Sequence, residues 1–198
     1  MSSDIIMDKR LVRSNILIGW VFLVLGIVGA VLSAIITTEK IELLKDASHN
    51  LSCSFNEDFS CGNVMTSWQA DTFGFPNMII GLIGFGIISA IGAGIIAGAK
   101  YKPWFWFMVI IGLLLGTIFA HWLFYSAVYI IGSLCIYCMG VWAVMVFLFT
   151  KTLSFVFVNY APQEKPFSMI TNILYKYWVV IGLVWYGIIM LLTYIQFS

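Results

Sequence analysis

Four cysteines are the residues best suited to chemistry in this sequence, and they fall into two pairs. Cys53 and Cys61 are separated by seven residues, and Cys135 and Cys138 form a C-x-x-C motif. Thiols and disulfides pass electron pairs to one another by exchange. The pattern therefore predicts redox chemistry, provided that the fold brings the two pairs together on an oxidising side of a membrane.

The C-x-x-C motif falls where an apolar segment begins, so we expect Cys135 and Cys138 on the first turn of a helix. Residues three apart are neighbours on a helix surface, close enough for a disulfide that a small adjustment opens or closes. Free backbone N–H groups and the helix dipole favour a thiolate there. Such a thiol is also a good leaving group in exchange.

Other interpretations explain fewer of the cysteines. A C-x-x-C motif in a membrane helix can be two small apolar residues, and four thiols can bind zinc. The mouth of a lipid-embedded helix is an awkward source of metal ligands, so we predict no metal site. A static extracellular disulfide accounts for Cys53 and Cys61 but leaves the motif unexplained. A mobile loop that carries Cys53 and Cys61 to the helix pair accounts for all four.

The composition places these cysteines in a membrane protein. Hydrophobic residues make up 62% of the 198 residues and charged residues 10%, whereas soluble domains carry about 25% charged residues. Without a Lys/Arg-rich run, nucleic-acid binding is excluded. About 20 apolar residues cross a bilayer as a helix, and the sequence offers five candidate spans: 15–37, 77–99, 104–129, 134–149 and 177–195.

We therefore predict an all-α integral membrane protein, a four-helix bundle plus a fifth transmembrane helix. Residues 1–150 are expected to form the catalytic bundle, and residues 151–198 an inner linker, 152–176, and the fifth helix. With a cytoplasmic N-terminus, all Lys and Arg except Lys40 and Lys45 lie inside, as the positive-inside rule requires. The C-terminus and both cysteine pairs then lie outside.

The only long outer loop, 38–75, carries too many aromatic residues for a solvated linker. Its start, 39–44, is expected to extend the first helix, and 62–70 to form a short helix over the bundle mouth. Inside the spans, His121 is expected to be a neutral histidine between helices rather than a proton relay. Glycines of the second and third spans are expected to serve helix packing: Gly81, Gly84, Gly94, Gly98, Gly112 and Gly116.

The order and spacing of these features resemble the vitamin K epoxide reductase family over residues 15–149. The match rests on the Cys53 and Cys61 pair, the later C-x-x-C, and the residues between them: Val64, Ser67, Phe73-Gly74-Phe75-Pro76 and Asn77.

The resemblance implies a role for each matching residue. Cys135 and Cys138 form the active-site pair beside a quinone, with Cys138 facing the ring. Cys61 is the shuttle cysteine that exchanges with Cys135, and Cys53 exchanges with a partner protein outside the membrane. Four further residues complete the implied site: Ser67, which helps to arrange it, Asn77, which hydrogen-bonds a quinone carbonyl, and Val64 and Met65, which provide apolar contacts.

Two departures from the family pattern stand out. Trp142 occupies the position at which vertebrate members have a quinone-binding tyrosine, and its indole N–H donates with a different reach. The fifth span resembles bacterial members, which favours a bacterial plasma membrane. Since the chain ends at Ser198 without a fused thioredoxin-like domain, we expect a separate thioredoxin- or DsbA-like partner.

The predicted function is a quinone-dependent thiol–disulfide oxidoreductase. Electrons pass from the partner to Cys53/Cys61, then to Cys135/Cys138, then to a membrane quinone of the menaquinone, ubiquinone or vitamin K type, which supports disulfide formation in exported proteins. One alternative is a quinone epoxide reductase that uses thiols as the reductant. Another is a non-enzymatic, tetraspan-like interaction protein that does not need Cys138.

Overall fold

A computed structural model describes residues 2–46, 51, 53, 59–160 and 165–197. In these ranges the protein is helical and contains no strand. The long helices are α1 (Ser2–Lys45), α3 (Met78–Ile96), α4 (Pro103–Ser126), α5 (Ile136–Tyr160) and α6 (Lys165–Phe197). All five are long and apolar enough to cross a membrane, which confirms the predicted fold class.

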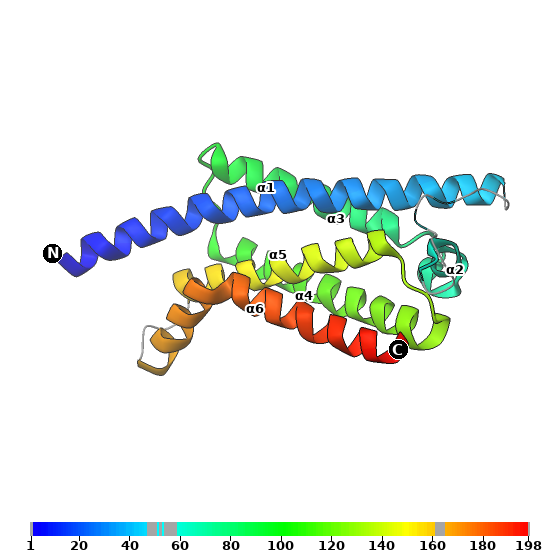
Figure 1. Cartoon of the computed structure of the whole chain (residues 1–198). Coiled ribbons are helices and arrows are strands. Elements are labelled where there is room, and N and C mark those ends of the chain that lie inside the picture. Colours follow the sequence, from blue (N-terminus) through cyan, green and yellow to red (C-terminus); the bar gives the residue numbers. More distant parts are fainter. Residues whose placement is uncertain (1, 47–50, 52, 54–58, 161–164, 198) are drawn as a thin grey trace.

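The helix α5 lies at the centre of the bundle and contacts α1, α4 and α6, while α3 packs along α1 (Figure 1). A π-helical turn, η2 (Ala127–Ile131), extends α4 toward α5. The short helices α2 (Cys61–Thr66) and η1 (Trp68–Asp71) lie at the end of the bundle that also holds the C-terminus. The N-terminus lies at the opposite end, as an odd number of crossings requires.

Close packing between α1 and α3 depends on glycine. A Cβ atom at Gly92 would lie 2.5 Å from the backbone nitrogen of Leu23, so the two helices touch backbone to backbone. For Gly84, Gly98 and Gly112 the packing prediction is wrong, because a Cβ atom at any of these positions meets nothing within 4 Å. Gly98 has a positive φ of 96° after the end of α3, whereas Gly84 and Gly112 face a cavity between α3 and α4.

The predicted inner linker, 152–176, is largely helical. α5 continues to Tyr160 and α6 begins at Lys165, so most of this segment extends the flanking helices. Pro166 does not prevent this, because it is the second residue of α6, where proline is tolerated; Pro162 lies outside the described residues. The predicted fifth span, 177–195, begins where α6 kinks, at Tyr177 (φ −117°, ψ 15°).

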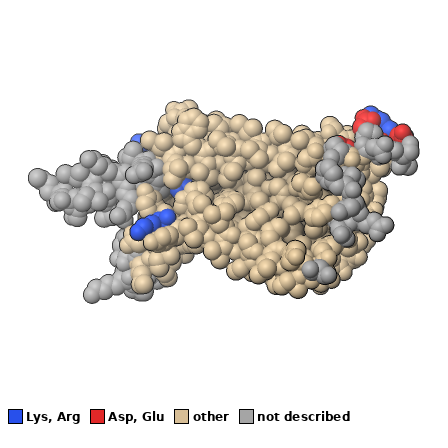
Figure 2. Space-filling model, viewed as in Figure 1, with Lys and Arg blue, Asp and Glu red and all other residues tan. Residues whose placement is uncertain are grey.

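The outer loop is organised by the first helix. α1 has 44 residues and at 1.5 Å per residue extends about 66 Å, roughly twice the thickness of the hydrocarbon core. The predicted extension over 39–44 is therefore confirmed, and the predicted short helix over 62–70 appears as α2 followed by η1. The acidic side chains in view gather at this end of the molecule (Figure 2).

Candidate redox site

The fold brings the two cysteine pairs into contact. Cys53 and Cys61 are joined by a disulfide, and the sulfur of the free thiol Cys135 lies 3.2 Å from the sulfur of Cys61. These three residues are 1%, 0% and 2% exposed, and they pack with Ile36 and Met65. A thiol therefore faces a disulfide in a site shielded from water, which is the arrangement needed for exchange.

Cys135 directly precedes α5, where its sulfur caps the first turn of the helix. The backbone N–H of Cys138 donates to this sulfur over 3.3 Å, and the N–H of Met139 donates to the carbonyl of Cys135. The hydrogen bond from the Cys138 thiol, assisted by the N–H groups of Cys138 and Tyr137, holds the pKa of Cys135 below its ordinary value, although burial raises it. Cys135 therefore ionises more readily than an ordinary thiol.

This effect predicts a measurable titration. In a Cys53→Ala/Cys61→Ala protein, which retains Cys135 and Cys138, the first thiolate is expected to form below the ordinary thiol pKa. Adding Cys138→Ala removes the thiol donor, so the midpoint should move upward. The ultraviolet absorbance of thiolate against pH measures both. An unchanged midpoint after the Cys138 substitution would contradict the assigned cause.

The sulfurs of Cys53, Cys61 and Cys135 all lie within 4.8 Å of one another, a spacing that metal ions also use. Two of the three are bonded to each other, so the group presents one thiol and one disulfide. A metal needs several thiolates at once. A thiol beside a disulfide is a group suited to exchange chemistry.

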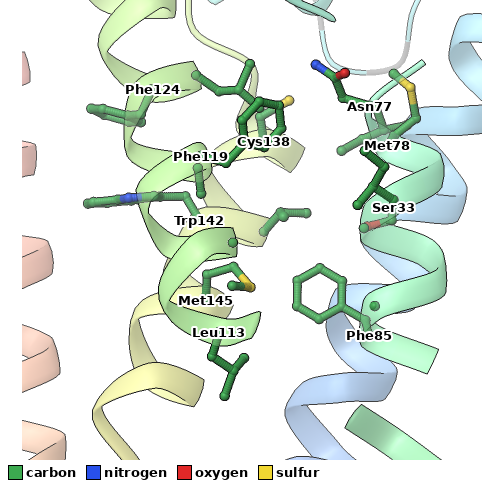
Figure 3. Close-up of a pocket in the computed structure, with 18 of the residues that line it drawn as sticks. Ser33, Asn77, Met78, Phe85, Leu113, Phe119, Phe124, Cys138, Trp142 and Met145 are labelled. Atoms are coloured by element: carbon green, nitrogen blue, oxygen red, sulfur yellow. The ribbon is translucent and has the colours of Figure 1, made fainter. Parts of the chain in front are cut away.

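A cavity of about 790 Å³ lies between α3 and α4 and is lined at one end by Cys135 and Cys138 (Figure 3). Its wall along α3 runs from Asn77 to Ile91, a distance of about 21 Å at the helical rise. The lining is almost entirely apolar, and most of its few polar side chains lie at the end near the cysteines. It includes every predicted site residue except Cys53 and Cys61: Val64, Met65, Ser67, Asn77, Cys135, Cys138 and Trp142.

Asn77 is the polar side chain best placed to bind a ligand. It directly precedes α3, but its side chain does not cap the helix, and its Nδ2 donates instead to the carbonyl of Gln69. Asn77 is 8% exposed, and its Oδ1 has no hydrogen-bond partner among the described residues. A buried polar atom left unpaired costs about 1–3 kcal/mol. The second N–H of the amide suits a quinone carbonyl, and Oδ1 suits a quinol hydroxyl.

Ser67 and Met65 stabilise the short helix α2, which lies above the cavity. The hydroxyl of Ser67 donates to the carbonyl of Val64 over 2.7 Å, which closes the last turn of α2. The Met65 side chain is buried against Cys61 and Cys135. The first contact closes the end of α2, and the second packs α2 against the start of α5 above the cavity.

Trp142 forms part of the cavity wall, but its indole points away from the cavity (Figure 3). The ring stacks on Phe124 with centroids 4.7 Å apart and packs against Tyr186 of α6 at 5.0 Å. Its Nε1 lies 3.3 Å from Nδ1 of His121. In this rotamer the N–H does not reach the cavity, so the contribution of Trp142 is apolar.

His121 joins α4 to α6. Its Nδ1 lies 2.7 Å from the carbonyl of Thr117, and its Nε2 accepts the indole N–H of Trp185 over 3.1 Å. The indole N–H of Trp142 also points at Nδ1, so each ring nitrogen has a hydrogen-bond partner. Both ring nitrogens are then used in packing, which agrees with the role favoured from the sequence.

Two residues at the site escaped the sequence analysis. Gln69 is buried in the cavity wall and orients the Asn77 amide through its carbonyl. Lys40 is buried beneath α2 and bonds to the carbonyl of Met65. The sequence contained one indication of a role for Lys40. It lies on the outer side, where the positive-inside rule expects few lysines.

The fold and the site define an integral membrane protein with a thiol–disulfide redox centre above an apolar cavity. Residues 20–153 match the model of the Vitamin K epoxide reductase family, and because this match covers more than half of the chain, the protein belongs to that family. No individual curated protein matches the chain significantly. Family membership makes the protein an oxidoreductase with a quinone as electron partner.

Proposed function

We propose that this protein reoxidises a separate thioredoxin- or DsbA-like protein outside the membrane and passes the electrons to a membrane quinone, so that exported proteins acquire disulfides. The observation that carries the proposal is the 3.2 Å contact between the sulfurs of Cys61 and Cys135 at the mouth of the cavity. Through this contact, electrons can pass from the outer cysteine pair to a lipid-soluble oxidant in the cavity.

The first exchange takes electrons from the partner. A thiolate of the partner attacks the sulfur of Cys53, which breaks the Cys53–Cys61 bond and releases Cys61 as a thiolate. A second thiol of the partner then attacks the mixed disulfide and releases Cys53. The partner leaves with a new disulfide, and both loop cysteines are reduced by its two electrons.

The second exchange moves this electron pair inward. The Cys61 thiolate attacks Cys135 in a Cys135–Cys138 disulfide, forms a Cys61–Cys135 bond and releases Cys138. Cys53 then attacks Cys61, which restores the Cys53–Cys61 disulfide and releases Cys135. A lowered pKa makes Cys135 a good leaving group. The structure corresponds to the state after this step, with the loop disulfide formed and Cys135 and Cys138 free.

The third step returns Cys135 and Cys138 to the disulfide. A quinone accepts the two electrons and two protons of the thiols and becomes a quinol. Asn77 is placed to hold one oxygen of the ring, and the cysteines border the same end of the cavity. The cavity volume lies within the roughly 300–1,000 Å³ of small-molecule sites. Its length along α3 and α4 suits a quinone with an isoprenoid tail.

The proposal includes a division of the chain and an orientation. Residues 1–150 carry the catalytic bundle, and residues 151–198 add the end of α5 and the fifth span. The N-terminus lies in the cytoplasm of a bacterial cell, and the cysteines and the C-terminus lie outside its plasma membrane. Supporting this orientation, Glu39, Glu42, Asp46 and Asp71 lie in segments near α2, whereas Lys100 and Lys102 occupy the turn between α3 and α4 at the other end of the bundle (Figure 1).

The direct test mixes the reduced, purified protein with menaquinone in the absence of oxygen. Quinol should appear as thiols disappear, one quinol for each disulfide formed. Quinol formation without loss of thiols would refute the proposal.

The family's description favours one second candidate, in which a quinone epoxide is the physiological substrate and thiols are only the reductant. The same cavity and cysteines serve both reactions. Turnover of menaquinone compared with that of its epoxide separates the two, because only the second candidate requires the epoxide to be reduced.

The relay itself is tested by a Cys53→Ala variant. Without Cys53 to resolve it, the disulfide between Cys61 and Cys135 is expected to accumulate, with Cys138 left as a free thiol. Mass spectrometry of the non-reduced protein, after oxidation by quinone, identifies the linked peptides. A variant that shows only Cys135–Cys138 pairing would count against the relay.

A further inference from the structure

A buried lysine links the first helix, α1, to the short helices α2 and η1. Lys40 lies on the part of α1 that projects beyond the membrane, yet it is only 5% exposed. Its ammonium group donates to the carbonyl of Met65 in the last turn of α2 and pairs with the carboxylate of Asp71 in η1 over 2.9 Å. A single side chain of α1 thus holds both short helices.

These ties matter because α2 has only six residues. Isolated helices shorter than about 12–15 residues are marginal in water, so the place of α2 is set by its tertiary contacts. Near its start, the amide of Asn63 donates to the hydroxyl of Ser133, two residues before Cys135. Near its end, the contact is Lys40. Between them, Cys61 is held against Cys135.

We propose that Lys40, with Asp71 as its counterion, is a positioning residue for the exchange between Cys61 and Cys135. The inference rests on the proposed function and adds a determinant of its internal step. Exchange requires the attacking sulfur to approach along the bond that breaks, and a displacement of 1 Å costs about 100-fold in rate. Removing Lys40 frees the end of α2 that follows Cys61 and leaves the carbonyl of Met65 without its cationic donor.

The experiment uses the full chain with Cys53→Ala, so that the Cys61–Cys135 disulfide cannot be resolved by Cys53. After quinone oxidises Cys135 and Cys138, the rate at which Cys61–Cys135 forms is followed by acid quench and mass spectrometry. Lys40→Met is expected to slow this step at least about tenfold, the lower limit for losing a hydrogen bond to a charged group. Lys40→Arg keeps the charge and the donors and should restore much of the rate.

A matched control lies five residues further along α1. Lys45 also pairs with a carboxylate, that of Glu42, but its side chain is 65% exposed. Lys45→Met should leave the exchange rate unchanged. Oxidation of Cys135 and Cys138 by quinone, measured in the same samples, should be unchanged in all three variants, which shows that the bundle and cavity are intact.

The outcomes separate the two proposals. If Cys53→Ala alone yields no Cys61–Cys135 disulfide, the relay of the proposed function fails. If it yields this disulfide and Lys40→Met forms it at the same rate, the relay stands and the positioning role is refuted. Should Lys40→Met fail to accumulate in membranes, Asp71→Asn decides in its place, since it removes the counterion and keeps the lysine: a slower exchange supports the role, and an unchanged rate overturns it.

Discussion

Cys138→Ala protein is expected to reduce quinone at least about 1,000-fold more slowly than the unchanged protein, because a covalent participant is lost. Cys135 alone cannot form the intramolecular disulfide that releases two electrons. Cys138 borders the cavity beside Cys135, whereas Cys53 and Cys61 do not line it. Anaerobic quinol formation by the reduced protein measures the effect.

The matched control for this variant is Ile136→Ala, which changes an exposed residue within the same motif and should leave quinol formation unaffected. Before reduction, the Cys53–Cys61 disulfide should be present in both proteins as a sign of an intact outer face. Quinol formation at the unchanged rate by the Cys138 variant would mean that electrons bypass the C-x-x-C motif. It would also favour a role for the cysteines outside catalysis.

The contact between the cysteine pairs follows from features that the sequence displays. The spacing of Cys135 and Cys138 at the start of an apolar span specifies a helix end, and charge bias places the outer loop at the same end. Only fifteen residues, which include most of α2 and all of η1, separate Cys61 from Asn77, which directly precedes α3. These constraints act within short segments or come from the membrane. They can therefore be inferred from the sequence without knowing how the helices pack.

The orientation of Trp142 illustrates what the sequence does not specify. Its position on α5 follows from the C-x-x-C motif, but its rotamer is decided by Phe124 of α4 and Tyr186 of α6. Those contacts depend on how α6 packs against α5, and no periodic pattern encodes that. Lys40 is a similar case, since its partners Met65 and Asp71 are brought to it only by the folded loop.

The glycines are a second example of packing that the sequence does not specify. Small residues signal close approach in membranes, and Gly92 does meet the backbone of α1. Gly84 lies on the same helix, in an equally apolar setting, but faces the cavity. The sequence indicates that space is needed beside each residue. Whether a helix or a ligand fills that space depends on the separation of α3 and α4.

This distinction leads to a test of what the cavity binds. In a Gly84→Leu/Gly112→Leu protein, the new side chains project into the cavity from α3 and α4 without meeting protein atoms at Cβ. They should obstruct an isoprenoid tail and leave the cysteine end open. We expect kcat/KM for a long-tailed menaquinone to fall by about 10- to 100-fold, the scale of 1–3 kcal/mol of steric conflict. Turnover of a naphthoquinone without a tail should change little.

Gly86→Leu provides the control, because Gly86 also has open space beside it on α3 but does not line the cavity. Rates with the two quinones, measured for both proteins in the same lipid, separate obstruction of the tail from a general effect of added bulk. Equal losses with long-tailed and tail-less quinones would show that the substitutions disturb the ring site instead. Unchanged turnover of the long-tailed quinone would place its tail elsewhere, because two leucine side chains and the tail cannot occupy the same narrow space between α3 and α4.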